Sequence, residues 1–312
     1  MTTWIGWEGR VGVWLIERRR RREEREAKQF TPTVSSGADR QTDCNFGTRR
    51  EFLTDHEIKF SNGASYDRTT GAWSRIAGSQ FLNWLAPAPG QKWVDIGCGT
   101  GAFTEQIIQN CSPLSVEGVD PSLEQIQYAS GNPQIDLANF RTGDAMDLPF
   151  KVDQFDIATM ALVLFFVPDP DIAVSEMKRV VRPGGTIAGY VWDIFNGGLH
   201  LEPFHVEFRR LNISYPLPPS AQISKMETLE KLWSESGLTS IRTKRFKVER
   251  IFSSFEELWN FGEETTALAP VLKSLNQKII ENIKAGLKTK IPPADDGSVK
   301  YSAYVNAIQG KG

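Results

Sequence analysis

A carboxylate directly ahead of three glycines is the feature of this chain that most clearly suggests chemistry. Asp95 stands two residues before Gly97, and Gly99 and Gly101 follow at alternate positions. Glycines in such a turn let the backbone adopt left-handed conformations and approach a ligand closely. A carboxylate at the buried end of a strand needs a partner, and a pyrophosphate would be repelled by it. The ammonium group of a ligand with an amino-acid tail would neutralise it, so the pattern favours such a cofactor.

Two further acids follow this turn. Asp120 comes directly after a short apolar run, 114–119, and lies about 20 residues beyond Gly101, where an acid on a second strand meets ribose hydroxyls. Its alternative role is to cap a helix expected to start at Pro121, because proline is favoured at the first helical position. Asp144 follows a glycine, and alone it is a weak signal because this dipeptide is common in turns.

Strands and helices alternate around these acids. The apolar run 93–96 meets the glycine turn, and Phe103, Ile107 and Ile108 then recur at helical spacing. Parallel strands that alternate with helices of about 10 to 15 residues build a doubly wound α/β sheet, which binds ligands outside the carboxyl ends of its strands. With further strands expected at 114–119, 155–160 and 186–192, that edge collects Asp95, Asp120, Asp144 and Ala161.

Helical and strand patterns continue on both sides of this region. Apolar residues at helical spacing predict a helix at 69–86, before the first strand. Beyond the fifth strand, the patterns predict helices at 226–237, 255–268 and 279–287 and strands at 239–251 and 299–308.

The run VDIGCGTG at 94–101 resembles the first motif of class I S-adenosylmethionine-dependent methyltransferases, particularly the small-molecule "type 11" and quinone-biosynthesis group. The resemblance covers about 66–191 in ordered pieces. It implies a Rossmann-like sheet of about seven strands, with the last strand antiparallel and a helical insertion before it. It also implies S-adenosyl-L-methionine as cofactor and contacts to it from Tyr66, Asp95, Gly97, Cys98, Gly99, Gly101, Asp120, Pro121, Asp144, Ala145 and Ala161.

The implied reaction is transfer of a methyl group to an oxygen, nitrogen or carbon atom of a small molecule by in-line displacement. Many members of the family carry histidine where this chain has Phe165 or Phe166, so no general base can be assigned there. His200 and His205 are the candidate catalytic residues, because a histidine titrates near neutral pH. His205 and Arg209 would share a helical face. No metal-ligand pattern accompanies them.

Other functions remain open at this stage. Gly97 to Ala102 also fits the loose dinucleotide pattern, but an NAD(P)-dependent oxidoreductase would have an apolar residue at position 95 and a Tyr-x-x-x-Lys motif, which the sequence lacks. A non-catalytic S-adenosylmethionine-binding protein is a further alternative. An amine methyltransferase of nucleic acids would carry an Asn/Asp-Pro-Pro-aromatic motif after the fourth strand, where residues 161–164 read ALVL.

Composition and charge favour a protein that acts on small molecules. A net charge of −2 gives no general attraction to nucleic acid, and the three cysteines form no disulfide framework, as is typical of a cytoplasmic protein. We expect no transmembrane segment and cannot predict the oligomeric state. Residues 1–59 are expected to form a poorly ordered or helical extension, and 60–312 the methyltransferase domain, with substrate-side insertions at about 193–225 and 252–298.

Overall fold

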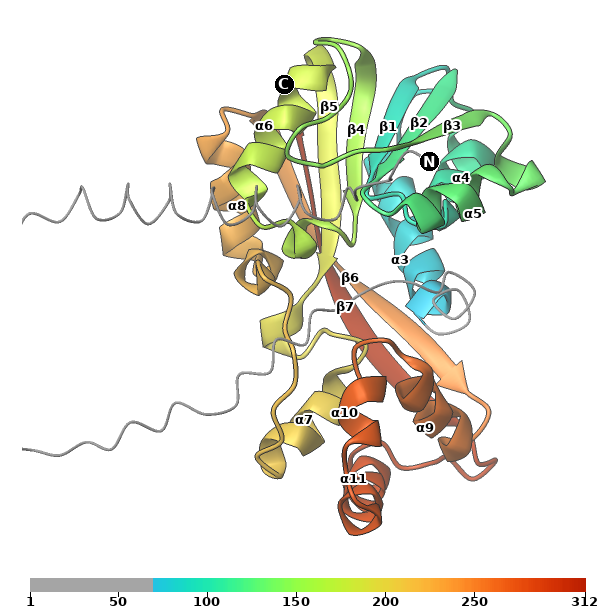
Figure 1. The fold of residues 1–312 in the computed structure, drawn as a ribbon. Helices are drawn as coiled ribbons and strands as arrows, with labels where there is room; N and C mark the ends of the chain where they lie inside the picture. The colour runs from blue at the N-terminus through green and yellow to red at the C-terminus, as the bar shows by residue number, and fades with distance from the viewer. Residues whose placement is uncertain (1–69) are drawn as a thin grey trace, which may run out of the picture. The chain divides into compact units, whose positions relative to one another are not determined.

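The computed structural model describes residues 70–312, and all of them belong to one compact unit (Figure 1). The extension expected at 1–59 and the cofactor contact predicted for Tyr66 lie outside the described residues.

A seven-stranded sheet organises this unit. The strand order is β3-β2-β1-β4-β5-β7-β6, and β7 pairs antiparallel with both of its neighbours, while the other strands run parallel to one another. The last strand therefore inserts between the fifth and the sixth, as the sequence resemblance implies. The strands are β1 Lys92–Ile96, β2 Ser115–Asp120, β3 Ala138–Thr142, β4 Phe155–Ala161, β5 Val181–Trp192, β6 Thr239–Phe252 and β7 Val299–Lys311.

Helices cover both faces of this sheet (Figure 1). Right-handed crossovers place helices on opposite faces when the strand order reverses direction, as it does between β1 and β4. The first layer of helices contains α3 Thr70–Leu85, α4 Ala102–Cys111 and α5 Leu123–Ser130, and the second contains α6 Pro170–Val180 and α8 Met226–Glu235. Tyr190 on β5 packs towards the first layer, with its ring centroid 4.8 Å from that of Phe81 and 5.8 Å from that of Phe103.

Strands β6 and β7 extend beyond the carboxyl end of β5. The pairing of β5 with β7 ends at Trp192 and Val305, but β6 and β7 stay paired from Phe246 and Val305 to Phe252 and Val299. In Figure 1 this two-stranded extension leads to a group of helices at the carboxyl edge of the sheet. These helices are α7 Glu202–Arg210, α9 Phe255–Glu264, α10 Ala269–Lys273 and α11 Gln277–Lys290.

Most predicted elements are found within a few residues of their expected bounds, with three differences. The helix after β2 starts at Leu123, not Pro121, because the Ser122 side chain accepts from the Gln125 amide and caps the helix. Residues 183–185 lie inside β5 as an irregularity rather than before it. The helix expected at 255–268 ends at Glu264.

Within residues 70–312, no helix is both long and apolar enough to cross a bilayer. The same residues contain no group of three or more His, Cys, Asp or Glu side chains arranged to hold a metal ion.

Candidate active site

The glycine turn between β1 and α4 uses left-handed backbone at all three glycines. The φ angles are 72° at Gly97, 53° at Gly99 and 83° at Gly101. A Cβ at Gly97 would lie 2.4 Å from the Val163 side chain, and one at Gly101 would lie 2.7 Å from Ile135. A Cβ at Gly99 would meet no heavy atom within 4 Å. The turn is therefore packed on two sides and open at Gly99, where a ligand can approach the backbone.

Asp95 is the penultimate residue of β1, two residues before Gly97, and is 1% exposed. Its Oδ2 atom accepts a hydrogen bond of 2.7 Å from the Thr104 hydroxyl, whereas Oδ1 is buried with no hydrogen-bond partner among the described residues. Burial raises the pKa of Asp95 to about 7, and the nearby Asp120 carboxylate adds to the rise, while the Thr104 hydrogen bond lowers it. A buried carboxylate oxygen without a partner is an acceptor suited to a cationic ligand.

Asp120 ends the neighbouring strand β2 and faces the same turn. Its Oδ2 accepts from the Gly99 amide at 3.0 Å and its Oδ1 from the Ser122 amide at 2.9 Å. Burial raises the pKa of Asp120, and these two amides oppose the rise. The helix-cap alternative is wrong, because Ser122 caps α5. Pro121 lies between β2 and α5, next to Asp120, whose carboxylate accepts from the Gly99 amide of the turn.

The remaining predicted cofactor residues lie at the same edge of the sheet. The Asp144 side chain accepts from the Met146 amide at 2.8 Å, and Asp144 and Ala145 are half-buried in a turn next to the end of β2. The Cys98 thiol is buried, 3.0 Å from the position of a Cβ at Gly118, and burial raises its pKa. Ala161, the last residue of β4, is half-buried.

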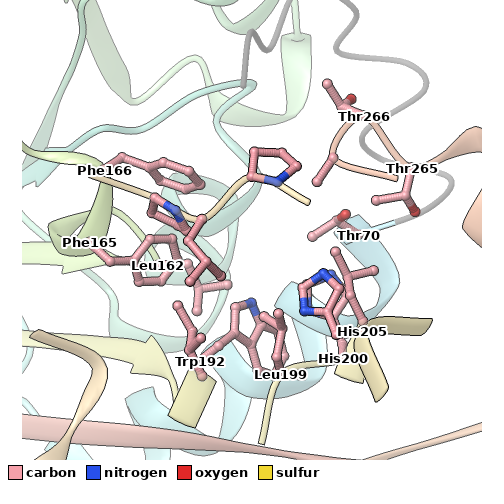
Figure 2. A pocket seen from close by; sticks show the side chains of 16 residues that line it. Thr70, Leu162, Phe165, Phe166, Trp192, Leu199, His200, His205, Thr265 and Thr266 are labelled. Atoms are coloured by element: carbon pink, nitrogen blue, oxygen red, sulfur yellow. The ribbon is translucent and has the colours of Figure 1, made fainter. Parts of the chain in front are cut away.

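A second feature of this edge is a mainly apolar cavity of about 80 Å³. Phe165 and Phe166 form one wall and His200 and His205 the opposite wall in Figure 2, with Trp192 near the base. Among residues 70–312, its lining contains no lysine, arginine or carboxylate. The lining residues are Thr70, Leu162, Phe165, Phe166, Trp192, Ile194, His205 and the segments 199–201, 216–218 and 265–267.

His200 is 5% exposed, and neither of its ring nitrogens has a hydrogen-bond partner among the described residues. Its ring lies 4.8 Å from that of Trp192 and 6.0 Å from that of Phe261, so aromatic packing rather than hydrogen bonding holds it. Burial lowers the pKa of His200 to about 3. The side chain is therefore neutral at physiological pH, with one nitrogen able to donate and the other to accept.

His205 lies on α7 and stacks on Tyr215 with ring centroids 4.0 Å apart. Burial lowers the pKa of His205 to about 3. Arg209, predicted to share its face, donates to the Tyr215 hydroxyl at 2.8 Å and pairs with Glu202. Arg209 thus supports the ring against which His205 stacks and does not line the cavity.

The glycine turn and the cavity meet at the carboxyl end of β4. Val163 packs against Gly97, and its neighbour Leu162 lines the cavity. Leu162 has a φ of 62°, a left-handed conformation that is strained for a leucine. Its amide donates to the Tyr190 carbonyl at 2.9 Å, which ties this bend to β5. The strained backbone of Leu162 thus lies where the glycine turn and the cavity meet, and strained backbone tends to cluster at functional sites.

Several residues of this site are missed by sequence reasoning. Thr104 falls within an ordinary helical pattern, and only its distance from Asp95 reveals their contact. The loop at 265–267 reaches the cavity because α9 ends early. The proline-rich stretch 215–219 was the one available signal, since such a run indicates a rigid loop.

A comparison with known families gives a matching domain type. Residues 94–189 match the family model described as "Methyltransferase domain". This range contains the glycine turn, the acid at the end of β2, the acid that follows β3, and most of β5.

Curated relatives match a part of the chain. It is 33% identical over 117 residues to a ubiquinone/menaquinone biosynthesis C-methyltransferase of Ruegeria sp., covering 36% of this chain and 47% of the relative. It is 33% identical over 144 residues to a demethylmenaquinone methyltransferase of Lysinibacillus sphaericus, covering 42% of this chain and 59% of the relative. The chain thus spans about half the length of the curated relatives it matches.

A solved structure extends the likeness to the fold. A protein of Anabaena variabilis, described as a candidate methyltransferase of an antibiotic biosynthesis pathway, matches with a TM-score of 0.53 at 18% identity, covering 75% of this chain and 98% of that chain. At this identity the likeness concerns the fold alone. Together with the strand order, it confirms the Rossmann-like α/β sheet that the sequence predicts.

Proposed function

We propose that this chain transfers a methyl group from S-adenosylmethionine to a neutral, hydroxyl-bearing small molecule. The match of residues 94–189 to a methyltransferase domain supports the transfer. The observation that carries the proposal is the buried Asp95 carboxylate with one oxygen unpartnered directly before an open glycine turn. A nicotinamide cofactor presents pyrophosphate to such a turn and offers no cation to this oxygen.

The residues at the turn fit the cofactor. Asp95 would accept from its ammonium group, the open side of Gly99 would let it approach the backbone, and Asp120 would accept from its ribose hydroxyls. Asp144 and Ala145 would line the adenine, and Ala161 would lie towards the acceptor. When bound, the cofactor supplies a methyl group on a sulfonium, which leaves as a neutral thioether. The protein therefore mainly has to hold the acceptor close and exclude water.

The cavity beside the turn would hold the acceptor. A carboxylate, phosphate or ammonium group would enter an apolar space whose lining, as far as residues 70–312 form it, offers no opposite charge, at a high desolvation cost. The neutral imidazole of His200 offers both a donor and an acceptor to a hydroxyl group. A neutral ring compound with a hydroxyl satisfies both the aromatic walls and this imidazole.

Among such compounds we favour a quinol-like acceptor. The curated relatives at 33% identity are described as methyltransferases of ubiquinone and menaquinone biosynthesis. A ring nitrogen of His200 that accepts a hydrogen bond from the hydroxyl would raise the electron density on the oxygen and on the ring carbons beside it. This arrangement would allow methylation either at carbon or at oxygen.

Calorimetric titration of the full chain with S-adenosylhomocysteine and with NADH tests the cofactor. Binding of the first and not the second supports the proposal, and the reverse would exclude it. Transfer of labelled methyl groups to hydroxynaphthoquinols, compared with phosphorylated and amine acceptors, then tests the acceptor class. Cofactor binding without transfer to any acceptor would favour the non-catalytic alternative.

A further inference from the structure

We propose that Thr104 is a positioning residue for the cofactor: its hydroxyl fixes the Asp95 carboxylate so that Oδ1 stays available to the cofactor's ammonium group. This inference rests on the proposed function and assigns a role within the same site. It concerns a residue that lies outside the glycine turn, on the helix behind it.

The contact joins the two elements that flank the turn. Asp95 is the penultimate residue of β1, and Thr104 lies in the first turn of α4, fully buried. The Thr104 Oγ1 atom donates to Asp95 Oδ2 over 2.7 Å, the length of a strong hydrogen bond to a carboxylate. Because one oxygen is engaged from the helix side, the carboxylate cannot rotate freely, and only Oδ1 is left for a ligand.

Thr104 also favours the ionised form that an ammonium ligand requires. Burial and the Asp120 carboxylate both raise the pKa of Asp95 and so oppose its ionisation. The Thr104 hydrogen bond is the contribution that lowers the pKa of Asp95. Without it, the carboxylate would be buried with neither oxygen bonded, and more of it would be protonated at neutral pH.

This role affects only one end of the cofactor. Asp120 is held by the Gly99 and Ser122 amides, not by Thr104. Loss of the Thr104 hydroxyl should therefore weaken ligands that carry the amino-acid tail and spare those that carry only the nucleoside part.

Calorimetry on the full-length Thr104→Val and Thr104→Ser variants tests this role, with S-adenosylhomocysteine and 5′-methylthioadenosine as the two ligands. The second ligand keeps the nucleoside but lacks the amino-acid tail. Valine should weaken S-adenosylhomocysteine binding about tenfold, the effect of one hydrogen bond to a charged group. It should leave methylthioadenosine within about twofold, and serine should restore the wild-type value because a single hydroxyl contributes little beyond that bond.

Other outcomes overturn the inference. An equal loss for both ligands in Thr104→Val would assign Thr104 to packing of α4, and unchanged binding of both would remove any role in positioning. Thermal melting checks that the variants fold, and Thr104→Ala repeats the comparison without the extra methyl group if valine is not tolerated. Failure of the wild-type chain to bind either ligand would instead refute the proposed function, and this inference with it.

Discussion

The two halves of the site are built in opposite ways. The cofactor half comes from one continuous stretch, 92–147, in which β1, β2 and β3 contribute their carboxyl ends in order. The acceptor half is assembled from segments between Thr70 and 267 that are far apart in the sequence. The first half presents carboxylates and backbone amides, whereas the second presents apolar walls and two histidines.

Burial has a common effect in both halves but leaves different chemistry. It shifts Asp95 and His200 towards their neutral forms, and each keeps polar atoms without partners among the described residues. The pKa of Asp95, about 7, is close enough to neutral pH that binding of a cationic ligand can shift the side chain to its ionised form. The pKa of His200, about 3, is so low that the ring stays neutral. We infer that the cofactor half binds a charged group and that the acceptor half excludes charged groups.

The strongest test of this contrast is Asp95→Asn, which keeps the shape of the side chain and removes its charge. S-adenosylhomocysteine binding should weaken about 100-fold or more, since breaking a buried ion pair costs about 3–5 kcal/mol. Calorimetry measures the loss, and full retention of affinity would contradict our placement of the ammonium group.

The same variant should be more stable than the wild type without ligand. The folded pKa of Asp95, about 7, lies above the ordinary value of 3.8, so this group's contribution to stability declines as pH rises from about 4 to about 7 and stays low above that range. Asparagine has no such dependence. Thermal melting at pH 8 and pH 4 should therefore show the advantage of Asp95→Asn mainly at pH 8.

A smaller effect is expected from Gly99→Ala, with Gly90→Ala as a matched control. Both glycines have positive φ, 53° and 74°, and a Cβ at either meets no atom within 4 Å, so each variant should lose about 1–2 kcal/mol of stability. Only position 99 faces the proposed ligand, and there the added methyl should weaken S-adenosylhomocysteine about tenfold or more. Equal binding by the two variants would place the ligand elsewhere.

The pH dependence of binding provides a graded test of the cofactor half. Below pH 7 the ligand must displace a proton from Asp95, so affinity for S-adenosylhomocysteine should fall about tenfold per pH unit. Well above pH 8, where the ammonium of the ligand's amino-acid tail deprotonates, affinity should fall again. Asp95→Asn is the control. It retains Asp120, the other acid that faces Asp95, so titration of Asp120 is present in both the variant and the wild type. A profile equally steep in this variant would assign the titration to another group.

The cofactor half could be predicted from the sequence because its chemistry is local. A glycine turn, a preceding acid and the next strand's acid lie at fixed spacings that the α/β topology brings to one edge. The incorrect prediction in this half is also local: Pro121 was expected to start a helix, but the helix starts at Leu123, because the Ser122 side chain caps it. The contact of Thr104 with Asp95 was also missed, since helical periodicity does not distinguish a buried threonine from any other core residue.

The acceptor half could be predicted only in part because it depends on packing between distant segments. The candidate histidines were identified by type, and both line the cavity. The sequence did not predict that burial would hold them neutral, or that α9 would end early and place 265–267 beside them. Nothing in the local pattern around Leu162 predicts its left-handed backbone, which arises where β4 bends between the two halves.

The smallest expected effect tests the independence of the halves. His200→Phe removes two buried nitrogens that lack partners among the described residues and keeps an aromatic ring beside Trp192. The KM for a hydroxyl-bearing acceptor should rise about three- to tenfold, as for one hydrogen bond between neutral groups, while S-adenosylhomocysteine affinity stays unchanged. His205→Phe, in the same cavity but stacked on Tyr215, is the matched control and should change the KM less. If His200→Phe weakened the cofactor as much as the acceptor, the two halves would be coupled through Leu162 rather than separate.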